Sequence, residues 1–315
     1  MAVHGGAGNA SAEDLPKERE TRIRAKLAEA LEAGYEILTS GGSAVDAVER
    51  TIRLLEDSPL FNAGKGAVFT AAGTNELDAS IMDGAKMEAG AVAGVTTIKN
   101  PIAAARAVME RTEHVLLAGP AANDFAADAG LETVDSSYFF TERRWQALQE
   151  RIEREKTEES TKSSRASPRS SGAPEPSTHF GTVGAVALDS MGRIAAGTST
   201  GGMTYKRHGR VGDSPIIGAG TYANGECGVS ATGHGEYFIR HAVAFDICAR
   251  MRYLGLSLLE AATSVVNGTL MEVGGDGGVI AIDTDGNTAL VFNTRNMARA
   301  WIDSNGEPRT AIFRQ

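Results

Sequence analysis

One threonine of this sequence is placed to act as a nucleophile at a new chain end. Gly181-Thr182 precedes the apolar run 183–188 and follows residues 157–178, a segment made almost entirely of serine, threonine, proline and charged residues. If the bond before Thr182 were cut, its new α-amino group, with a usual pKa of about 8, could take the proton from its own hydroxyl. The sequence therefore predicts self-cleavage between Gly181 and Thr182 and an N-terminal threonine nucleophile. The alternative is an ordinary threonine in a β-strand, where this residue is common.

Two further groups of hydroxyl and glycine residues lie where they could assist such a nucleophile. Residues 198–200, Thr-Ser-Thr, end the strand that we expect to pair with the strand of Thr182, so their hydroxyls would lie beside it. Residues 232–235, Thr-Gly-His-Gly, precede a helix expected over 237–251, and the free N–H groups of a helix N-terminus can bind an oxyanion. Both groups favour nucleophilic attack on a carbonyl carbon.

Arg210 and Asp213 could recognise an amino acid. They stand three residues apart in a glycine-flanked loop. A guanidinium can bind an α-carboxylate through two parallel hydrogen bonds, and a carboxylate can accept hydrogen bonds from an α-ammonium. The pair therefore predicts a zwitterionic substrate, although an ion pair at the surface has the same spacing.

These residues need a sheet to hold them, and the second half of the sequence predicts one. Two hairpins are expected because Asp- and Gly-containing turns separate pairs of apolar runs. Their strands are 183–188 with 193–196 and 278–283 with 289–292, and helices are expected over 237–251 and 256–266.

The first half predicts helices between glycine-rich loops, because apolar residues recur every three or four positions or follow a residue that favours a helix N-terminus. The expected helices begin at Pro16, Ser43, Asn100 and Thr141, and residues 115–118 are expected to form a short buried strand. Hairpins combined with long amphipathic helices predict an α+β fold with a layered α/β/β/α arrangement. A doubly wound parallel sheet is disfavoured because repeated βαβ units are missing.

Residues 157–178 are expected to be disordered. They cannot bury enough apolar surface to offset the entropy lost on ordering them. Such a segment is either a functional, cleavable loop or a linker between two domains.

Composition limits the function classes that remain. The 315 residues carry 40 acidic and 31 basic side chains, a net charge of −9, so the basic surface needed for nucleic-acid binding is missing. No run approaches the roughly 18 apolar residues of a membrane span, and none resembles a signal peptide. We therefore expect a cytoplasmic protein without nucleic-acid or membrane partners. Cys227 and Cys248 make neither a disulfide framework nor a zinc site and are expected to be packing residues.

Nine blocks of the sequence closely resemble the plant-type L-asparaginase/isoaspartyl peptidase family, in the family's order and over His4 to about Trp301. The blocks are HGGAG (4–8), PLFNAGKGAVFT (59–70), LDASIMDG (77–84), GAVAGV (90–95), GTVGAVALD (181–189), TSTGGM (198–203), GRVGDSP (209–215), GAGTYAN (218–224) and ATGHGE (231–236). The resemblance implies one domain, 1–315, with the four-layer αββα sandwich of N-terminal nucleophile hydrolases. It also implies self-cleavage into an α chain, 1–181, and a β chain, 182–315, which assemble as an (αβ)2 dimer.

The resemblance assigns roles to individual residues of this sequence. Thr182 would be the nucleophile and Thr200 the residue that tunes it. Thr232 and Gly233 would form the oxyanion hole. The family roles imply that Asn62 holds the released amino group, that Arg210 binds the substrate α-carboxylate, and that Asp213 with Gly235 binds the α-ammonium. His234, between the oxyanion-hole glycines, stands where the family commonly has a smaller residue.

A structural sodium ion is also implied, held by main-chain carbonyls of a loop over 55–65. The positions that match are Leu55, Glu56, Ser58, Phe61, Ala63 and Lys65. Lys65 stands where an apolar residue is usual in the family. No cofactor is expected to take part in catalysis.

The expected substrates are L-asparagine and β-aspartyl (isoaspartyl) dipeptides, which present the same zwitterionic head to Arg210 and Asp213. Two alternatives remain. A glycosylasparaginase would remove a sugar from asparagine, but that branch usually has a different stretch after the nucleophile. A non-catalytic binding module, for example for nucleotides, is disfavoured because the glycine-rich segments 5–8 and 274–278 lack the Gly-Lys-Ser/Thr of a P-loop.

Overall fold

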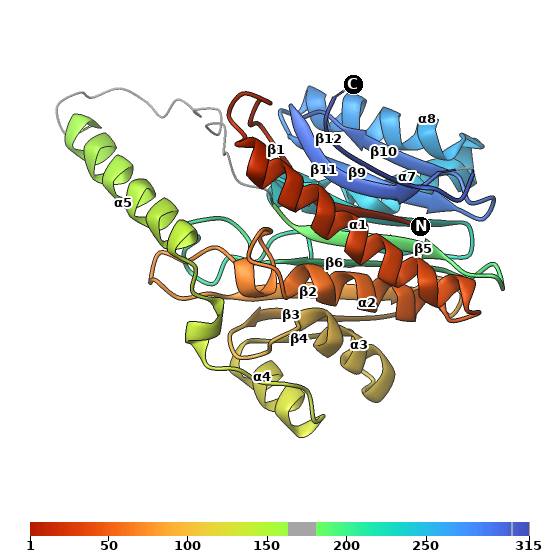
Figure 1. Cartoon of the computed structure of the whole chain (residues 1–315), viewed down its shortest axis with the longest axis horizontal. Helices are drawn as coiled ribbons and strands as arrows, with labels where there is room; N and C mark the ends of the chain where they lie inside the picture. The colour runs from red at the N-terminus through yellow and green to blue at the C-terminus, as the bar shows by residue number, and fades with distance from the viewer. Residues whose placement is uncertain (163–180, 304, 315) are drawn as a thin grey trace.

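The chain forms two β-sheets that face each other, with helices on their outer faces (Figure 1). This computed structural model describes residues 1–162, 181–303 and 305–314. The strands are β1 (Ala2–Gly8), β2 (Leu77–Asp83), β3 (Glu88–Val95), β4 (Leu116–Ala118), β5 (Val183–Leu188), β6 (Ile194–Thr200), β7 (Thr221–Ala223), β8 (Cys227–Gly233), β9 (Gly277–Asp283), β10 (Thr288–Phe292), β11 (Asn296–Ile302) and β12 (Pro308–Phe313).

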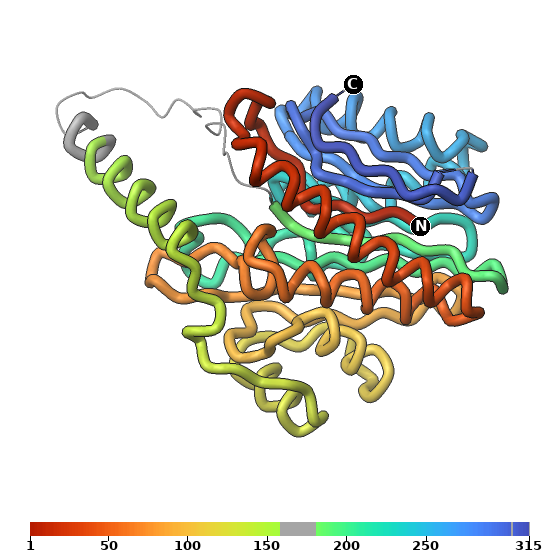
Figure 2. The backbone as a smooth tube through the Cα atoms, in the orientation of Figure 1, coloured from red at the N-terminus to blue at the C-terminus, as the bar shows by residue number. Residues whose placement is uncertain are grey.

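The larger sheet has the order β12-β11-β1-β5-β6-β2-β3-β4, and the smaller sheet has the order β10-β9-β8-β7. Neighbouring strands are antiparallel except β3 and β4. The tube in Figure 2 shows that β1, from the start of the chain, lies inside the larger sheet beside strands from its second half. Both predicted hairpins are confirmed, as β5–β6 and β9–β10.

Helices surround the two sheets in the described chain. They are α1 (Lys17–Thr39), α2 (Ala44–Glu56), α3 (Pro101–Arg111), α4 (Gly119–Asp128), α5 (Glu142–Lys162), α6 (Gly235–Arg240), α7 (Val243–Leu254) and α8 (Leu258–Thr263), with short turns over Gly64–Gly66 and Ser136–Phe139 and a π-helical segment over Ser264–Leu270. α1, α2 and α3 pack on the larger sheet, whereas α7 and α8 pack on the smaller one. The four helices predicted in the first half are confirmed, and the Ser43 side chain accepts the Asp46 N–H at the start of α2, as expected of a capping residue.

Three apolar clusters fill the spaces between these layers. The first lies between the larger sheet and its helices and includes Ile23, Leu27, Ile52 and Val183. The second lies under α7 and α8, and the third, with Ala2, Val186 and Ile280, separates the two sheets. The structure is thus mixed α and β, as predicted. One face of the larger sheet is turned toward the smaller sheet, and the residues predicted to do chemistry lie on that face.

Three expectations about local structure are confirmed only in part. The single helix expected over 237–251 is broken, because Ala242 adopts a left-handed conformation (φ 46°) between α6 and α7. The helix expected over 256–266 starts at Leu258 and passes into the π-helical segment. The strand expected over 115–118 forms as β4, but Leu116 is exposed and not buried, because β4 is the last strand of the larger sheet and pairs with β3 alone among the described strands.

Two expectations about the linker and the cysteines also change. Helix α5 continues to Lys162, so the first residues of the segment 157–178 are helical, and its remainder lies outside the described residues. Cys227 on β8 and Cys248 on α7 form a disulfide with 5.6 Å between their Cα atoms, instead of packing as separate thiols. Among the described residues, no helix is long and apolar enough to cross a membrane.

Candidate active site

The polar residues predicted to do chemistry lie at one end of the inward face of the larger sheet. Strands β1, β5, β6 and β2 lie side by side, and side chains two residues apart share a face, so residues in register form rows. The row within the inter-sheet core is Ala2, Val186, Ala196 and Met82. The next row is His4, Gly184, Thr198 and Ser80, and the row beyond it contains Thr200 and Asp78, with Thr182 directly before β5.

Thr182 and Thr200 lie together, as the hairpin predicts. The Thr182 hydroxyl donates a hydrogen bond to the Thr200 hydroxyl, with 3.0 Å between the Oγ1 atoms, and both side chains are buried. Thr200 Oγ1 also accepts the Gly202 N–H at 3.0 Å. Two contacts therefore orient the Thr200 hydroxyl toward the candidate nucleophile.

Two other segments of the chain, around Asn62 and Thr232, lie next to the bond between Gly181 and Thr182. The Gly181 carbonyl oxygen accepts the main-chain N–H of Asn62 at 3.2 Å. Thr232 Oγ1, which accepts the Ala7 N–H at 3.1 Å, would lie 3.4 Å from a Cβ built on Gly181. An N–H on this carbonyl is placed to stabilise the negative charge that develops there when a nucleophile attacks.

Gly6 brings strand β1 into direct contact with this bond. Its φ is +104°, and a Cβ at this position would lie 2.2 Å from the nitrogen of Gly181 and 2.6 Å from its Cα. Any other side chain would collide with the main chain that precedes Thr182. Gly6 belongs to the HGGAG block, but nothing in the sequence alone indicates this contact.

The Asn62 side chain is engaged elsewhere in the uncut chain. Its Nδ2 donates to the Gly202 carbonyl at 2.7 Å, and its Oδ1 accepts the Val68 N–H at 3.0 Å. The group of Asn62 that contacts Gly181 is therefore its main-chain N–H and not its side chain. Its role toward a released amino group stays a prediction.

Thr232 and Gly233 end strand β8, where they are in register with Gly278 and Gly277. The long helix expected to follow them is replaced by α6, which has only six residues, and the His234 N–H donates to the Asp276 carbonyl at 3.1 Å. The long helix after Thr232 and Gly233 is therefore absent from the described residues. The role of Thr232 and Gly233 as an oxyanion hole stays a prediction.

Arg210, Asp213 and Gly235 lie together. A Cβ on Gly235 would be 2.9 Å from both Arg210 Nη2 and Asp213 Oδ1, so only glycine fits there. Asp213 is buried, and its Oδ2 has no hydrogen-bond partner among the described residues. Burial raises the pKa of Asp213 to about 7. A buried carboxylate oxygen without a partner is a group that a ligand ammonium would satisfy.

Glu236 is a site residue that the sequence did not single out. Arg210 donates from Nε and Nη2 to its two carboxylate oxygens at 2.9 and 2.8 Å. His234 Nε2 lies 3.2 Å from Glu236 Oε2. The hydrogen bonds from Arg210 lower the pKa of Glu236 to about 2, so Glu236 is ionised and holds one edge of the guanidinium. Its only sequence signal is its place as the last residue of the ATGHGE block.

Strand β2 connects the threonine row to the loop of Arg210 and Asp213. Ser80 Oγ donates to the Ser214 carbonyl at 2.6 Å, and Asp78, two residues earlier on the same strand, is in register with Thr200. Asp78 is fully buried and accepts the Gly94 N–H at 2.8 Å, and burial raises its pKa. The predicted residues thus converge on one region between the two sheets.

Comparison with known proteins identifies the family. A family model described as asparaginase matches residues 1–312. The chain belongs to the asparaginase family. It is similar to an isoaspartyl peptidase of Escherichia coli, at 49% identity over 100% of this chain and 96% of that protein. It is also similar to an isoaspartyl peptidase/L-asparaginase of Bos taurus (41% identity; 94% and 91%) and to a plant-type L-asparaginase of Pyrococcus abyssi (42%; 99% and 99%). The chain is therefore a hydrolase, as the sequence blocks predicted.

The family resemblance predicts a sodium ion in the loop over 55–65. In this hydrolase the loop is tightly folded, and its main chain passes close to its own carbonyl oxygens. A Cβ on Gly64 would lie 2.3 Å from the Glu56 carbonyl oxygen, and a Cβ on Gly66 would lie 2.0 Å from that of Phe61. Carbonyl oxygens are suitable ligands for a hard cation. The Glu56 carboxyl group points elsewhere: it accepts from Ser199, and burial raises its pKa to about 8. The Lys65 ammonium lies 5.1 Å over the Tyr138 ring.

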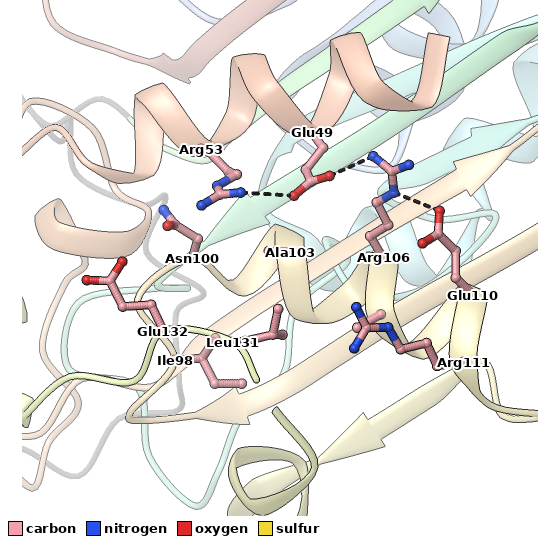
Figure 3. A pocket seen from close by; sticks show the side chains of 11 residues that line it. Glu49, Arg53, Ile98, Asn100, Ala103, Arg106, Glu110, Arg111, Leu131 and Glu132 are labelled. Carbon is pink, nitrogen blue, oxygen red and sulfur yellow. Dashed lines mark hydrogen bonds and ion pairs between the residues drawn. The ribbon is translucent and has the colours of Figure 1, made fainter. Parts of the chain in front are cut away.

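A cavity of about 170 Å³ lies on the other face of the larger sheet, between α2 and α3 (Figure 3). Arg106 pairs there with Glu49 and Glu110, both at 2.7 Å, and Arg53 pairs with Glu49 at 3.4 Å. These charges neutralise one another, and none of the residues predicted to do chemistry lines the cavity. It therefore lies apart from the candidate active site.

Proposed function

We propose that this hydrolase cleaves the side-chain amide of L-asparagine and the β-linked bond of isoaspartyl dipeptides, with Thr182 as its nucleophile. The observation that carries the proposal is the buried contact between the hydroxyls of Thr182 and Thr200, directly after a Gly181 carbonyl held by Asn62. The names of the similar isoaspartyl peptidases and asparaginases support the substrate class.

Self-cleavage would create the catalytic group. Thr182 Oγ1 attacks the Gly181 carbonyl carbon, and the main-chain N–H of Asn62 stabilises the oxyanion. The C–N bond between Gly181 and Thr182 then breaks, the Thr182 nitrogen takes up the proton lost by the hydroxyl, and an ester between Gly181 and Thr182 Oγ1 results. Water hydrolyses this ester and separates chains 1–181 and 182–315. The new α-amino group of Thr182 then serves as base for its own hydroxyl. The αββα sandwich of N-terminal nucleophile hydrolases is the fold that this proposal assigns, in agreement with the helix, sheet, sheet and helix layers.

Substrate hydrolysis would follow the same chemistry. Arg210 binds the α-carboxylate, and Asp213 beside Gly235 binds the α-ammonium. Thr182 attacks the side-chain carbonyl carbon, the Thr232 hydroxyl and the Gly233 N–H stabilise the tetrahedral oxyanion, and ammonia or an amino acid leaves. Water then hydrolyses the β-aspartyl ester of Thr182.

Two further features belong to the proposal. The carbonyls around Glu56 and Phe61 would hold a sodium ion that stiffens the loop carrying Asn62, without taking part in the reaction. Two cleaved copies would assemble as an (αβ)2 dimer.

The test combines a denaturing gel with an ammonia assay. Wild-type protein should separate into two chains and release ammonia from asparagine, and it should release leucine from β-aspartyl-leucine. Thr182→Ala should remain one chain and be inactive toward both substrates. A Thr182→Ala protein that still hydrolyses either substrate would refute the proposal. The values of kcat/KM for asparagine and for β-aspartyl-leucine, measured on one cleaved preparation, show which substrate is preferred.

A further inference from the structure

His4 is a fully buried histidine that contacts the main chain of the proposed nucleophile. Its Nδ1 lies 3.1 Å from the carbonyl oxygen of Thr182, and its Nε2 lies 3.0 Å from Ser230 Oγ. A carbonyl oxygen can only accept a hydrogen bond, so Nδ1 carries a proton and donates it. Burial lowers the pKa of His4 to about 3, so the ring is neutral and Nε2 accepts from the Ser230 hydroxyl.

Further hydroxyls continue this arrangement across the space between the two sheets. Thr198 Oγ1 lies 2.7 Å from Ser230 Oγ, accepts from Thr221 Oγ1 at 2.6 Å and donates to the Gly220 carbonyl at 3.0 Å. The space is tightly filled, because a Cβ on Gly184 would lie 2.4 Å from His4 Nε2 and 1.9 Å from Ser230 Oγ. The Thr182 carbonyl therefore fixes the tautomer, and the filled space around Ser230 fixes the place of the imidazole.

His4 is not placed to act as the base in the reaction. The Thr182 hydroxyl bonds to Thr200, on the other side of β5 from β1, and both ring nitrogens of His4 are engaged by Thr182 O and Ser230. Any effect of His4 on the nucleophile must pass through the Thr182 main chain. Holding that carbonyl fixes the rotation about the Cα–C bond, and with it the direction in which the side chain and nitrogen of Thr182 point.

We propose that His4 is a positioning residue, which holds the Thr182 carbonyl so that the hydroxyl and nitrogen of this residue face the carbonyl carbon under attack. The proposal rests on the proposed function, because it assumes Thr182 as nucleophile. It predicts slower self-cleavage and a lower kcat when the donor is lost. The KM for asparagine should stay unchanged, because the aspartyl head is bound by other residues, Arg210 and Asp213.

Three substitutions separate this role from simple packing. His4→Asn keeps a nitrogen donor at the place of Nδ1, His4→Gln keeps one only near the place of Nε2, and His4→Ala keeps neither. We expect self-cleavage and kcat within about threefold of wild type for His4→Asn, and a loss of roughly tenfold or more in both for His4→Gln and His4→Ala. KM should stay within about twofold in each cleaved variant.

A matched control is Thr51→Val, which removes another fully buried hydrogen bond, from Thr51 Oγ1 to the Ala30 carbonyl at 3.1 Å, on the opposite face of the sheet. It should lower stability but leave both rates within about twofold of wild type. If His4→Ala does not fold, Ser230→Ala provides the test: loss of the hydrogen bond to Nε2 lets the imidazole shift and should slow self-cleavage about threefold or more.

Two results would overturn the role of His4: equal rates for His4→Asn and His4→Gln, or wild-type rates for His4→Ala and Ser230→Ala. Either result leaves the proposed function intact as long as Thr182→Ala is inactive. An active Thr182→Ala protein refutes the proposed function itself, whatever the His4 variants do.

Discussion

Gly6→Ala should strongly slow self-cleavage at Thr182 while leaving the fold in place. The added Cβ would lie 2.2 Å from the nitrogen, 2.6 Å from the Cα and 2.7 Å from the carbonyl carbon of Gly181. Carbon and nitrogen atoms pack at roughly 3.5 Å, so residue 181 must move by about 1 Å. That movement pulls the Gly181 carbonyl away from both Asn62 and the Thr182 hydroxyl.

The size of the effect follows from this displacement. Misplacing a reacting group by about 1 Å can cost roughly 100-fold in rate. Alanine at a φ of +104° adds strain of about 1–2 kcal/mol, which lowers stability but does not by itself change the reacting geometry. We therefore expect self-cleavage to slow by about 100-fold, with a modest loss of thermal stability.

Gly41→Ala is the matched control for strain. Gly41 also has a positive φ, +82°, but a Cβ there meets nothing within 4 Å. A time course on a denaturing gel, with the precursor purified before cleavage is complete, compares both variants with wild type. Gly41→Ala should cleave at the wild-type rate. If Gly6→Ala cleaves as fast as Gly41→Ala, the close approach of β1 to the scissile bond does not matter and the reasoning is refuted.

Three other measurements follow from the structure. Burial raises the pKa of Asp213 to about 7, and the Thr182 α-amine, with a usual pKa of about 8, must also be neutral, so kcat/KM for asparagine should rise with pH through 7, most steeply below it, and level off only above about 8; a profile that is flat across pH 7 would contradict this. Glu236→Gln should raise KM about fivefold with kcat unchanged, because the paired Arg210 loses its charged partner; an unchanged KM would show that Arg210 needs no such support. Reducing the Cys227–Cys248 disulfide should lower the free energy of unfolding by about 3 kcal/mol, seen as a lower urea midpoint with dithiothreitol, whereas an equal midpoint would contradict a stabilising crosslink.

The sequence predicts the elements of this fold where local patterns decide them. The turn at 189–192 sets the hairpin register, and the register alone places Thr200 opposite Thr182. Apolar periodicity likewise predicts α1 and α2 nearly to their ends. Arg210 and Asp213 were predictable as a pair because only two residues of one loop separate them.

The remaining features depend on contacts between distant segments. His4 meets Thr182 and Ser230 across 178 and 226 residues, and no local pattern indicates that its ring is buried between two sheets. The disulfide also depends on a contact between separate elements, since Cys227 and Cys248 meet only when α7 packs on β8. The break at Ala242 was missed because an alanine with positive φ leaves no sequence signal.

The central claim is that Thr182, freed by self-cleavage, carries the acyl group. Cleaved enzyme mixed with asparagine, quenched in acid and digested, should yield a peptide that begins at Thr182 and is heavier by one aspartyl group attached through an ester. The uncut precursor should yield none. An aspartyl adduct on any other residue, or steady hydrolysis by protein whose Gly181–Thr182 bond is intact, would contradict the account.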